Sequence, residues 1–379
     1  MNETDFQIRE KSRPDFETGS RSLRIIDLFS GCGGLTLGTA LAAHQRNLAL
    51  DVALAVDLDQ DALQVYRRNF PKASTSSAPI ENSIDGSLGA PMTRTEEILV
   101  RETGAVHAIV GGPPCQGHSN LNNHTRRNDP KNLLYLRMIR AAEIFRPPVL
   151  IVENVPSVIH SEPDVVGLSI RFLASLGYSV AQEVVNLDRL GVPQTRKRHL
   201  LIATRIPDFI APMVFHHLSH GPGKTRDLRW AIGDLTDSKP TSTMDTPPAA
   251  SLDNQKRMNL MLRYNWYDLP NRYRPPCHQD GTHTYTSMYG RLRWDRPAQT
   301  ITRGFSSIGQ GRYMHPDRAR ALTHHEAARI QGFPDYFDFT DVTARSELAV
   351  IIANAVPPPL GLAVMDIILQ GLGISGLSI

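Results

Sequence analysis

The sequence predicts an α/β fold, a mainly parallel sheet with helices on both faces, followed by a smaller lobe of irregular structure. Through residue 204, short runs rich in Val, Ile and Leu alternate with helical patterns, as in parallel sheets that are covered on both faces. Beyond Arg205 the pattern changes to Pro- and Gly-rich sequence, which predicts the second lobe. The length of 379 residues suffices for one large domain and a smaller one.

Each predicted strand ends at a turn-forming or polar residue. The first run stops at Ser30-Gly31, the second at Asp57, and the run before Gly111 is broken by Gly and Pro. Helical patterns follow these turns, and one of them stops at Pro71. In order, we expect a strand at 24–29, a helix at 35–44, a strand at 52–56, a helix at 61–70, a strand at 106–110, a helix at 133–145, a strand at 149–152, and a closing strand pair at 178–185 and 199–204.

The composition is that of an ordinary intracellular protein. Hydrophobic residues make up 41% and charged residues 21%, which excludes wholesale disorder. The three cysteines are too few for a disulfide framework, so a reducing cytosol is expected. Residues 1–22 are charged and predict a flexible tail rather than a signal peptide. The apolar stretch 360–379 contains polar residues and glycines, which favours a packed helix over a membrane span.

Polar and glycine-rich residues gather at the predicted carboxyl ends of the strands, where ligands bind in parallel sheets. Gly31-Cys32-Gly33-Gly34 lies between a strand and a helix, so a ligand can approach its backbone closely. Asp57 ends the next strand and can accept both hydroxyls of a ribose, which indicates an adenosine-type cofactor. Thr36 stands where a dinucleotide fingerprint has its third glycine, which disfavours an NAD dehydrogenase. We interpret Cys32 as a small residue packed in the turn.

Cys115 is a candidate nucleophile because it follows a strand end on a stiff Pro-Pro loop. A free thiol is only about 3% thiolate at pH 7, and forming the thiolate costs roughly 2 kcal/mol unless cations lower its pKa. Arg196 and Arg198 are candidate cations, and Glu153 at the neighbouring strand end is a candidate acid or hydrogen-bond partner. The alternatives are a packed cysteine in a proline turn and a carboxylate in a surface ion pair.

The charge distribution is uneven, although the net charge is only +3. Residues 186–230 carry +5 and residues 256–320 carry +8, and the second of these stretches is rich in Tyr and Trp. Basic side chains interleaved with aromatics are typical of nucleic-acid surfaces. On charge alone, a solvated face with aromatic core residues explains the pattern equally well.

Motifs that include Asp27 to Leu35, Gly111 to Gly117 and Glu153-Asn154-Val155 resemble those of the cytosine-C5 DNA methyltransferase family. The motifs follow the family's order over about residues 23 to 370. His118, Ala353 and the segment 79–81 depart from the family's usual residues. The matching segments are Asp27 to Leu35 (first S-adenosylmethionine motif), Gly111 to Gly117 (nucleophile loop), Glu153-Asn154-Val155, Gln194 to Arg198 (Gln-x-Arg-x-Arg), and the later motifs at 296–302, 322–334 and 354–357, of which Glu326 to Gly332 alone would suggest a DNA-reading helix.

The resemblance implies a Rossmann-like S-adenosylmethionine-dependent sheet and a reaction on a flipped-out cytosine. Cys115 would add to C6, Glu153 would bind N3 and the exocyclic amine, Arg196 would contact the base carbonyl oxygen, and Arg198 would support the loop. The methyl group would then pass to C5. The cofactor contacts that the resemblance implies are Phe29, Ser30, Gly31, Gly33, Asp57, Leu58, Pro113, Leu134, Asn354 and Val356, with Ile80 or Glu81 as a guess near the adenine.

We expect a tail at 1–22, a catalytic domain at 23–204, a target-recognition region at 205–290, and a return to the catalytic domain at 291–379. The expected partner is double-stranded DNA, read by a short recognition region alone or with a partner's help. A metal at Cys277, His278 and His283 is not expected, because these residues lack paired-ligand spacing. Expected DNA contacts are Gln116, Ser119, Arg291, Arg293 and Arg303, with His278, His283 and Tyr285 as further candidates.

We expect a monomer that works in the cytoplasm, associated with the nucleoid. It would protect host DNA beside a cognate restriction endonuclease. Two other functions remain open at this stage. One is a tRNA methyltransferase on the same fold, which the Gln116 to Ser119 sequence disfavours. The other is a non-catalytic DNA-binding subunit, which the presence of Cys115, Glu153 and Arg196 disfavours.

Overall fold

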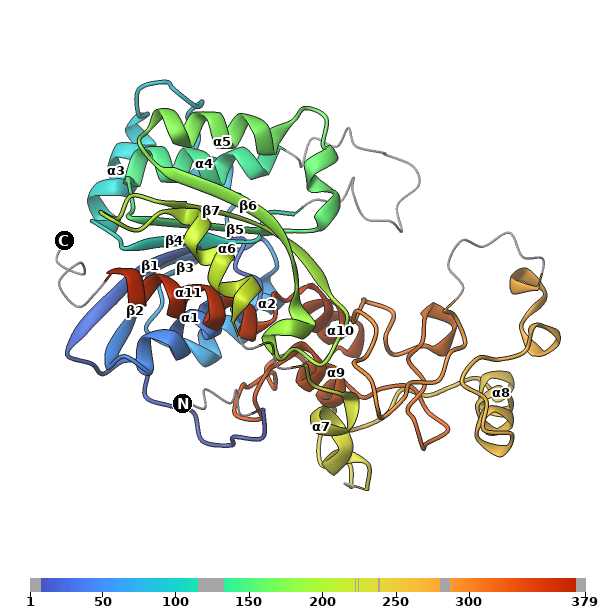
Figure 1. Ribbon diagram of the computed structural model, residues 1–379. Helices are drawn as coiled ribbons and strands as arrows, with labels where there is room; N and C mark the ends of the chain where they lie inside the picture. Colours follow the sequence, from blue (N-terminus) through green and yellow to red (C-terminus); the bar gives the residue numbers. More distant parts are fainter. Residues whose placement is uncertain are drawn as a thin grey trace.

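A computed structural model describes residues 8–114, 133–221, 223, 225–237, 239–279 and 287–372. Its centre is a seven-stranded sheet with the order β3-β2-β1-β4-β5-β7-β6 (Figure 1). The first five strands pair in parallel, whereas β7 runs antiparallel to both of its neighbours. The predicted mainly parallel sheet is therefore confirmed. The strands are β1 (Arg21–Leu28), β2 (Leu48–Val56), β3 (Thr75–Ser76), β4 (Ala108–Gly111), β5 (Val149–Asn154), β6 (Ser179–Asn186) and β7 (Lys197–Thr204).

Helices cover both faces of this sheet, and each face has its own apolar core (Figure 1). One face packs against α3, α4 and α5, and the other against α1, α2, α6 and α11. The helices are α1 (Gly34–His44), α2 (Gln60–Asn69), α3 (Arg94–Thr103), α4 (Leu134–Phe145), α5 (Val165–Ser175), α6 (Ala211–His220), α7 (Leu228–Ile232), α8 (Leu252–Arg263), α9 (His324–Gln331), α10 (Arg345–Asn354) and α11 (Pro358–Leu372).

The late helix α11 packs directly on the first helix, α1, through glycines. A Cβ atom on Gly38 would lie 2.2 Å from the carbonyl oxygen of Pro358 and 2.5 Å from the amide nitrogen of Leu362. A Cβ atom on Gly361 would lie 2.7 Å from the carbonyl oxygen of Leu35. The stretch 345–372 is long and apolar enough to cross a membrane, but 78% of its most apolar window is buried inside the protein. It is therefore a core element of this fold, in agreement with the packed helix predicted from residue 360 onward.

The segment before β1 is packed rather than flexible. Ile8 and Phe16 are buried in the core that includes α1. Backbone amides of Asp335 and Leu50 donate to the carbonyl oxygens of Ile8 (2.9 Å) and Phe16 (2.7 Å). The predicted flexible tail at 1–22 is therefore wrong for residues 8–22, and residues 1–7 lie outside the described part. The two buried residues are separated by charged ones, so they form no periodic pattern that a sequence could reveal.

The smaller lobe has a buried cluster of its own. Its buried cluster consists of residues from α8 and from the segments that follow (Met258, Met261, Leu269, Tyr289, Ile308, Met314 and Ala321). Residues 211–220, in contrast, form α6, which packs on β6 and α11 of the large domain. Leu292, Ala298, Ile301, Phe305 and Tyr313 pack in the core of the large domain, among the later residues of this cluster. The boundaries 205–290 of the recognition region stay a prediction.

Candidate active site

The turn after β1 forms a cradle in which one glycine faces open space. Phe29, Gly31 and Gly33 have φ angles of 58°, 52° and 90°, so the backbone turns sharply before α1 begins. A Cβ atom on Gly31 would meet nothing within 4 Å. A Cβ atom on Gly33 would lie 2.7 Å from the ring of Phe70, so Gly33 packs inward against α2. Of the two glycines predicted to contact a cofactor, Gly31 therefore borders the opening.

Asp57 lies at the same cradle, as its place at the end of β2 predicts. Its carboxylate accepts hydrogen bonds from the backbone amides of Gly31 (2.7 Å) and Asp59 (2.9 Å). Burial raises the pKa of Asp57 despite these bonds. The neighbouring Leu58 is 63% exposed, which places an apolar side chain at the rim. A carboxylate retains further acceptor positions after two hydrogen bonds, so Asp57 can still bind ribose hydroxyls.

The floor of the cradle holds a buried polar group that the sequence patterns do not reveal. The Thr36 hydroxyl donates to Asp27 (2.5 Å) and lies 2.9 Å from the Tyr66 hydroxyl. Burial raises the pKa of Asp27 to about 7. Burial also raises the pKa of Cys32 to about 12, so its thiol is neutral at pH 7. The prediction that Cys32 is a small packed residue is confirmed, since it is 1% exposed.

These residues fit an adenosine-type cofactor. The Ser30 hydroxyl is buried and has no hydrogen-bond partner among the described residues, so it can receive one from a ligand. The open side of Gly31 lets a ligand contact the backbone, and Asp57 and Leu58 offer a carboxylate and an apolar surface. Polar groups for the ribose and an apolar contact for the base are therefore present together.

Glu153 and Arg198 form an ion pair at the ends of two neighbouring strands. In the antiparallel pairing of β5 with β7, Glu153 lies opposite Leu200, so Arg198 is two residues further along the same face. The Arg198 Nε atom is 2.6 Å from the Glu153 carboxylate, and both side chains are largely buried. Burial lowers the pKa of Arg198, whereas the adjacent Glu153 charge opposes this change. The structure thus brings two of the predicted site residues, Arg198 and Glu153, into contact.

The Glu153 carboxylate lies beside the turn that leads to the predicted nucleophile. A Cβ atom on Gly112 would be 3.2 Å from the Glu153 Oε2 atom, and the Asn154 amide donates to the Pro113 carbonyl oxygen at 3.0 Å. Cys115 follows this turn, but it lies outside the described residues, as do Gln116 and Ser119. The position of the Cys115 thiol is therefore not part of the described geometry.

Arg196 lies deeper in the protein than its predicted role requires. Its guanidinium donates to the carbonyl oxygens of Ile301 (3.2 Å), Ala353 (3.3 Å) and Ala355 (3.5 Å). The residue is 3% exposed, and burial together with the Arg198 charge lowers its pKa. Arg198, and not Arg196, is therefore the arginine next to Glu153. The roles predicted for the two arginines stay predictions.

The predicted cofactor residues of the C-terminal segment meet the cradle from the other side. The Val356 carbonyl oxygen would be 2.1 Å from a Cβ atom on Gly34, and its Cγ2 atom 3.6 Å from one on Gly112. Val356 therefore bridges the glycine turn and the nucleophile turn. Asn354 is exposed, and its side-chain oxygen accepts a hydrogen bond from Arg303 at 3.2 Å. The remaining predicted contacts are the buried Pro113 and the half-buried Leu134 and Phe29, which pack on the core next to α4.

The basic residues predicted to contact DNA fall into different environments. Arg303 is exposed beside Asn354. Arg293 is half-buried and lies over the Tyr267 ring at 4.2 Å. Arg291 is buried, and its guanidinium donates to the carbonyl oxygen of Pro316 (2.5 Å) and to Asn265 (3.1 Å). Arg291 therefore ties the lobe together instead of facing solvent.

Candidates near α8 are described only in part. His278 packs edge-on against the Tyr289 ring at 5.6 Å, and Cys277 is exposed. His283 and Tyr285 lie outside the described residues. Across the described part of the chain, no three His, Cys, Asp or Glu side chains gather as metal ligands.

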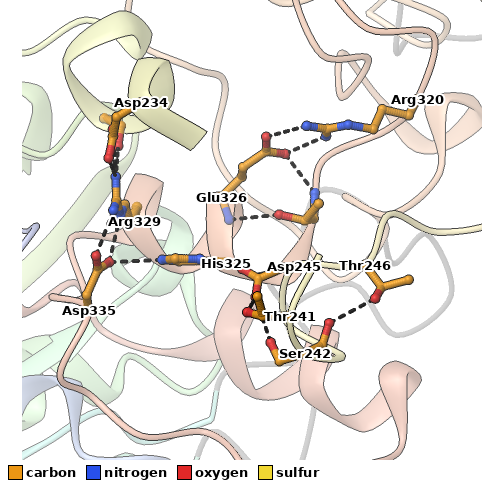
Figure 2. A network of polar contacts seen from close by, with 12 residues as sticks. Asp234, Thr241, Ser242, Asp245, Thr246, Arg320, His325, Glu326, Arg329 and Asp335 are labelled. Atoms are coloured by element: carbon orange, nitrogen blue, oxygen red, sulfur yellow. Dashed lines mark hydrogen bonds and ion pairs between the residues drawn. The ribbon is translucent and has the colours of Figure 1, made fainter. Parts of the chain in front are cut away.

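The helix α9, which alone would suggest a DNA-reading helix, is instead buried in a polar network (Figure 2). Arg329 donates to Asp234 (2.8 Å) and Asp335 (2.7 Å), and the two ring nitrogens of His325 lie 2.8 Å from Asp245 and 2.9 Å from Asp335. In the same network, Arg320 forms two 2.7 Å hydrogen bonds to Glu326. These contacts join α9 to the segments that enter and leave the lobe. The sequence of α9 does not by itself identify these partners.

Comparison with known proteins agrees with this geometry. The family model described as C-5 cytosine-specific DNA methylase matches residues 23–370. The chain is 42% identical to the Type II methyltransferase M1.BsuMI of Bacillus subtilis (strain 168), over 93% of this chain and 82% of that protein. It is 30% identical to the Type II methylase M.HgiDII of Herpetosiphon aurantiacus, over 89% of this chain and 92% of that protein.

A solved structure has the same fold. It is a putative DNA modification methyltransferase encoded within a prophage in E. coli, with a TM-score of 0.62 and 22% identity, and it covers 92% of this chain and 99% of its own. Because the family model spans the cradle, the Glu153–Arg198 pair and the closing segment, the chain belongs to the C-5 cytosine-specific DNA methylase family.

Proposed function

We propose that this DNA cytosine-5-methyltransferase modifies one short duplex sequence, flips the target cytosine out of the helix and forms a covalent Cys115–C6 adduct. Methyl transfer from S-adenosylmethionine to cytosine C5 is the activity of the family. The observation that carries the finer proposal is the Glu153–Arg198 pair at 2.6 Å, beside the turn that precedes Cys115. A base held by this pair would lie between the nucleophile loop and the cofactor cradle.

The chain's own residues supply the activation of the base. The Cys115 thiolate adds to C6, which makes C5 nucleophilic. Glu153 binds N3 and the exocyclic amine, so it stabilises the form in which charge accumulates on the ring. When bound, S-adenosylmethionine supplies the electrophilic methyl group that C5 accepts. A base then removes the C5 proton, the C5–C6 double bond re-forms, and Cys115 leaves as thiolate.

The two arginines take exchanged roles in this proposal. Arg198 lies next to Glu153 and has a side chain that reaches the rim of the site, so we assign it to the base carbonyl oxygen. Arg196 is occupied by three backbone carbonyls, so we assign it to support of the surrounding segments. Asp57, Ser30, Gly31 and Leu58 hold the cofactor from one side in this proposal, and the Asn354–Val356 segment closes the other side.

The biological setting is proposed from the relatives and from charge. The relatives in Bacillus subtilis and Herpetosiphon aurantiacus are named Type II enzymes, which supports a protective role beside a restriction endonuclease. The basic lobe, with exposed Arg303 nearby, is the surface we assign to double-stranded DNA. A monomer in the cytoplasm, working at the nucleoid, would suffice for this reaction.

The test is a methyl-transfer assay with labelled S-adenosylmethionine and unmethylated duplex DNA, followed by base-resolution mapping of 5-methylcytosine. Wild type should label one short sequence, and Cys115→Ser should abolish the label. Cys277→Ser is the matched control, because Cys277 is an exposed thiol in the lobe, and it should retain activity. Label in tRNA but in no DNA would overturn the proposed substrate. Undiminished labelling by Cys115→Ser would overturn the covalent mechanism.

A further inference from the structure

Gln331 is a buried glutamine at the end of α9 that joins two distant parts of the site. It is fully buried, with 0% of its surface exposed. Its amide nitrogen donates to the carbonyl oxygens of Ile352 (2.6 Å) and Ala353 (3.2 Å). Its side-chain oxygen accepts a hydrogen bond from Gln194 at 2.7 Å. Its hydrogen-bonding groups are thus engaged from two directions, which fixes the orientation of the amide.

The two carbonyls that Gln331 binds belong to the last turn of α10. Carbonyl groups at a helix C-terminus have no partner within the helix, and burial without one is costly. The Ala355 amide satisfies only the Ile351 carbonyl. Gln331 satisfies the next two, and Arg196 shares the Ala353 carbonyl at 3.3 Å. Gln331 therefore acts as a side-chain cap on the last carbonyls of α10.

The end of α10 determines the position of the segment that closes the cradle. Asn354 is the last residue of α10, and Val356 follows two residues later. Val356 contacts both the Gly34 turn and the Gly112 turn. Its carbonyl oxygen would lie 2.1 Å from a Cβ added to Gly34, and its Cγ2 atom 3.6 Å from a Cβ added to Gly112. A shift at Ile352 or Ala353 is transmitted directly to Val356, because only three and two residues, respectively, lie between them.

We propose that Gln331 is a positioning residue for the cofactor, because it holds the end of α10 so that Asn354 and Val356 close the S-adenosylmethionine pocket. This inference rests on the proposed function, in which those two residues line the pocket. Gln331 does not touch the cofactor in this proposal. It acts through Ile352 and Ala353.

Gln194 provides a matched control for Gln331. It is also fully buried, and it shares the 2.7 Å hydrogen bond with Gln331. Its other contacts are the Ile330 carbonyl (3.0 Å) and the Ile301 amide (3.1 Å), and neither belongs to α10. Gln331→Met and Gln194→Met therefore both remove the hydrogen bond between the two glutamines and both keep a similar side-chain volume. Only Gln331→Met releases the end of α10.

The experiment measures binding of S-adenosylmethionine and S-adenosylhomocysteine by calorimetry, together with thermal unfolding and duplex-DNA binding. Gln331→Met should weaken cofactor binding at least about tenfold while DNA binding stays within about twofold, because the lost donors serve the closing segment. Gln194→Met should weaken cofactor binding by less than about threefold at a comparable loss of thermal stability. Gln370→Met, on the exposed end of α11, should bind as wild type.

Unchanged cofactor affinity in Gln331→Met would overturn the inference, and so would an equal loss in both buried variants, since that would show a general effect of destabilisation. If Gln331→Met does not fold, Gln331→Glu takes its place, because a buried, protonated carboxyl keeps the acceptor and one donor. Its cofactor affinity should fall less than tenfold but measurably, and wild-type affinity would overturn the inference. A wild type that binds cofactor but methylates no DNA would contradict the proposed function alone.

Discussion

Arg196 lies just before β7 and Arg198 lies at its start, yet their guanidinium groups have different partners. Arg198 pairs with the Glu153 carboxylate, whereas Arg196 donates to three backbone carbonyls. The sequence identifies both as candidate cations for the Cys115 thiolate, but it does not predict which one pairs with Glu153. The difference depends on the segments that pack there from residues 301 and 353–355, and their approach is a property of the tertiary structure.

We expect the Arg198→Gln and Arg196→Gln variants to fail in different ways. Loss of Arg198 should lower kcat at least about 100-fold, because in the proposed mechanism it removes a charge at the reacting base. It should also lower Tm, because the buried Glu153 carboxylate loses its partner. Loss of Arg196 should lower the free energy of unfolding by about 2 kcal/mol or more, because buried carbonyls lose their donor. Steady-state kinetics and thermal unfolding of both variants check this. The reverse pattern would restore the roles expected from sequence.

His325 makes the protein's stability depend on pH. Both of its ring nitrogens face carboxylates, Asp245 and Asp335, which can only accept, so this geometry requires the imidazolium (Figure 2). Burial by itself would lower the pKa of His325, but the bonds to Asp335 and Asp245 outweigh it and the pKa is raised. Asp335 has its pKa lowered to about 2 by His325 and Arg329, although burial opposes this.

The sign of the effect follows from the raised pKa. The stabilisation by His325 is fully present below the unfolded-state pKa near 6.5 and is lost as pH rises through the higher folded-state pKa. We expect His325→Gln to reduce the free energy of unfolding by about 2 kcal/mol near pH 6, and by less at pH 9. Denaturant unfolding across pH 5–9 measures the difference. A difference that grows with rising pH would contradict the assignment.

At the scale of elements, the strength of the hydrophobic pattern decides which parts a sequence predicts. β1, β2, β4 and β5 are buried apolar runs, so the sequence places each of them correctly to within a few residues. The helices α3 and α5 are absent from the sequence-based assignment. Among residues 8–20, the described part of the N-terminal segment, the buried anchors are Ile8 and Phe16, which follow no period. Its packing is visible only once α1 and the segment around Asp335 are in place.

The contact between α1 and α11 gives a prediction for Gly38. A Cβ atom there would overlap backbone atoms of Pro358 and Leu362, and backbone moves less readily than a side chain. Gly38→Ala should lower the free energy of unfolding by about 3 kcal/mol, because overpacking forces the two helices apart. Gly223→Ala is the control, since its added Cβ would be 3.8 Å from the Arg189 carbonyl oxygen. Denaturant unfolding compares the two, and equal stability of both variants would contradict the close approach.

At the scale of the whole molecule, sequence reasoning locates the site better than it divides the domains. The cradle, Asp57 and Glu153 follow or end parallel strands, whose carboxyl ends meet at one edge of the sheet. Arg198 reaches the same edge from the start of the antiparallel strand β7. The lobe has short, irregular segments, and its boundary depends on which helix packs where. α6 follows the last strand in an irregular stretch but returns to the sheet, which composition does not indicate.

DNA binding by the whole molecule should depend steeply on salt. The basic stretch 256–320 carries +8, and the affinity of phosphate contacts falls with ionic strength as counterions are released. Arg303→Gln should weaken binding to duplex DNA and reduce the slope of log K against log salt by about one. Arg101→Gln, an exposed arginine on α3, serves as the control and should leave the slope unchanged. An identical slope for both variants would remove Arg303 from the DNA surface.

The contact of α11 with α1 also sets an order of events during protein synthesis. About 320 residues separate the two glycine-lined surfaces, so at about 5–20 residues per second a ribosome makes α11 roughly 16 to 64 s after α1. Until then the nascent chain exposes the apolar side of α1 and lacks Val356. Chaperones that bind the apolar side of α1 during this interval would keep it available until α11 packs on it.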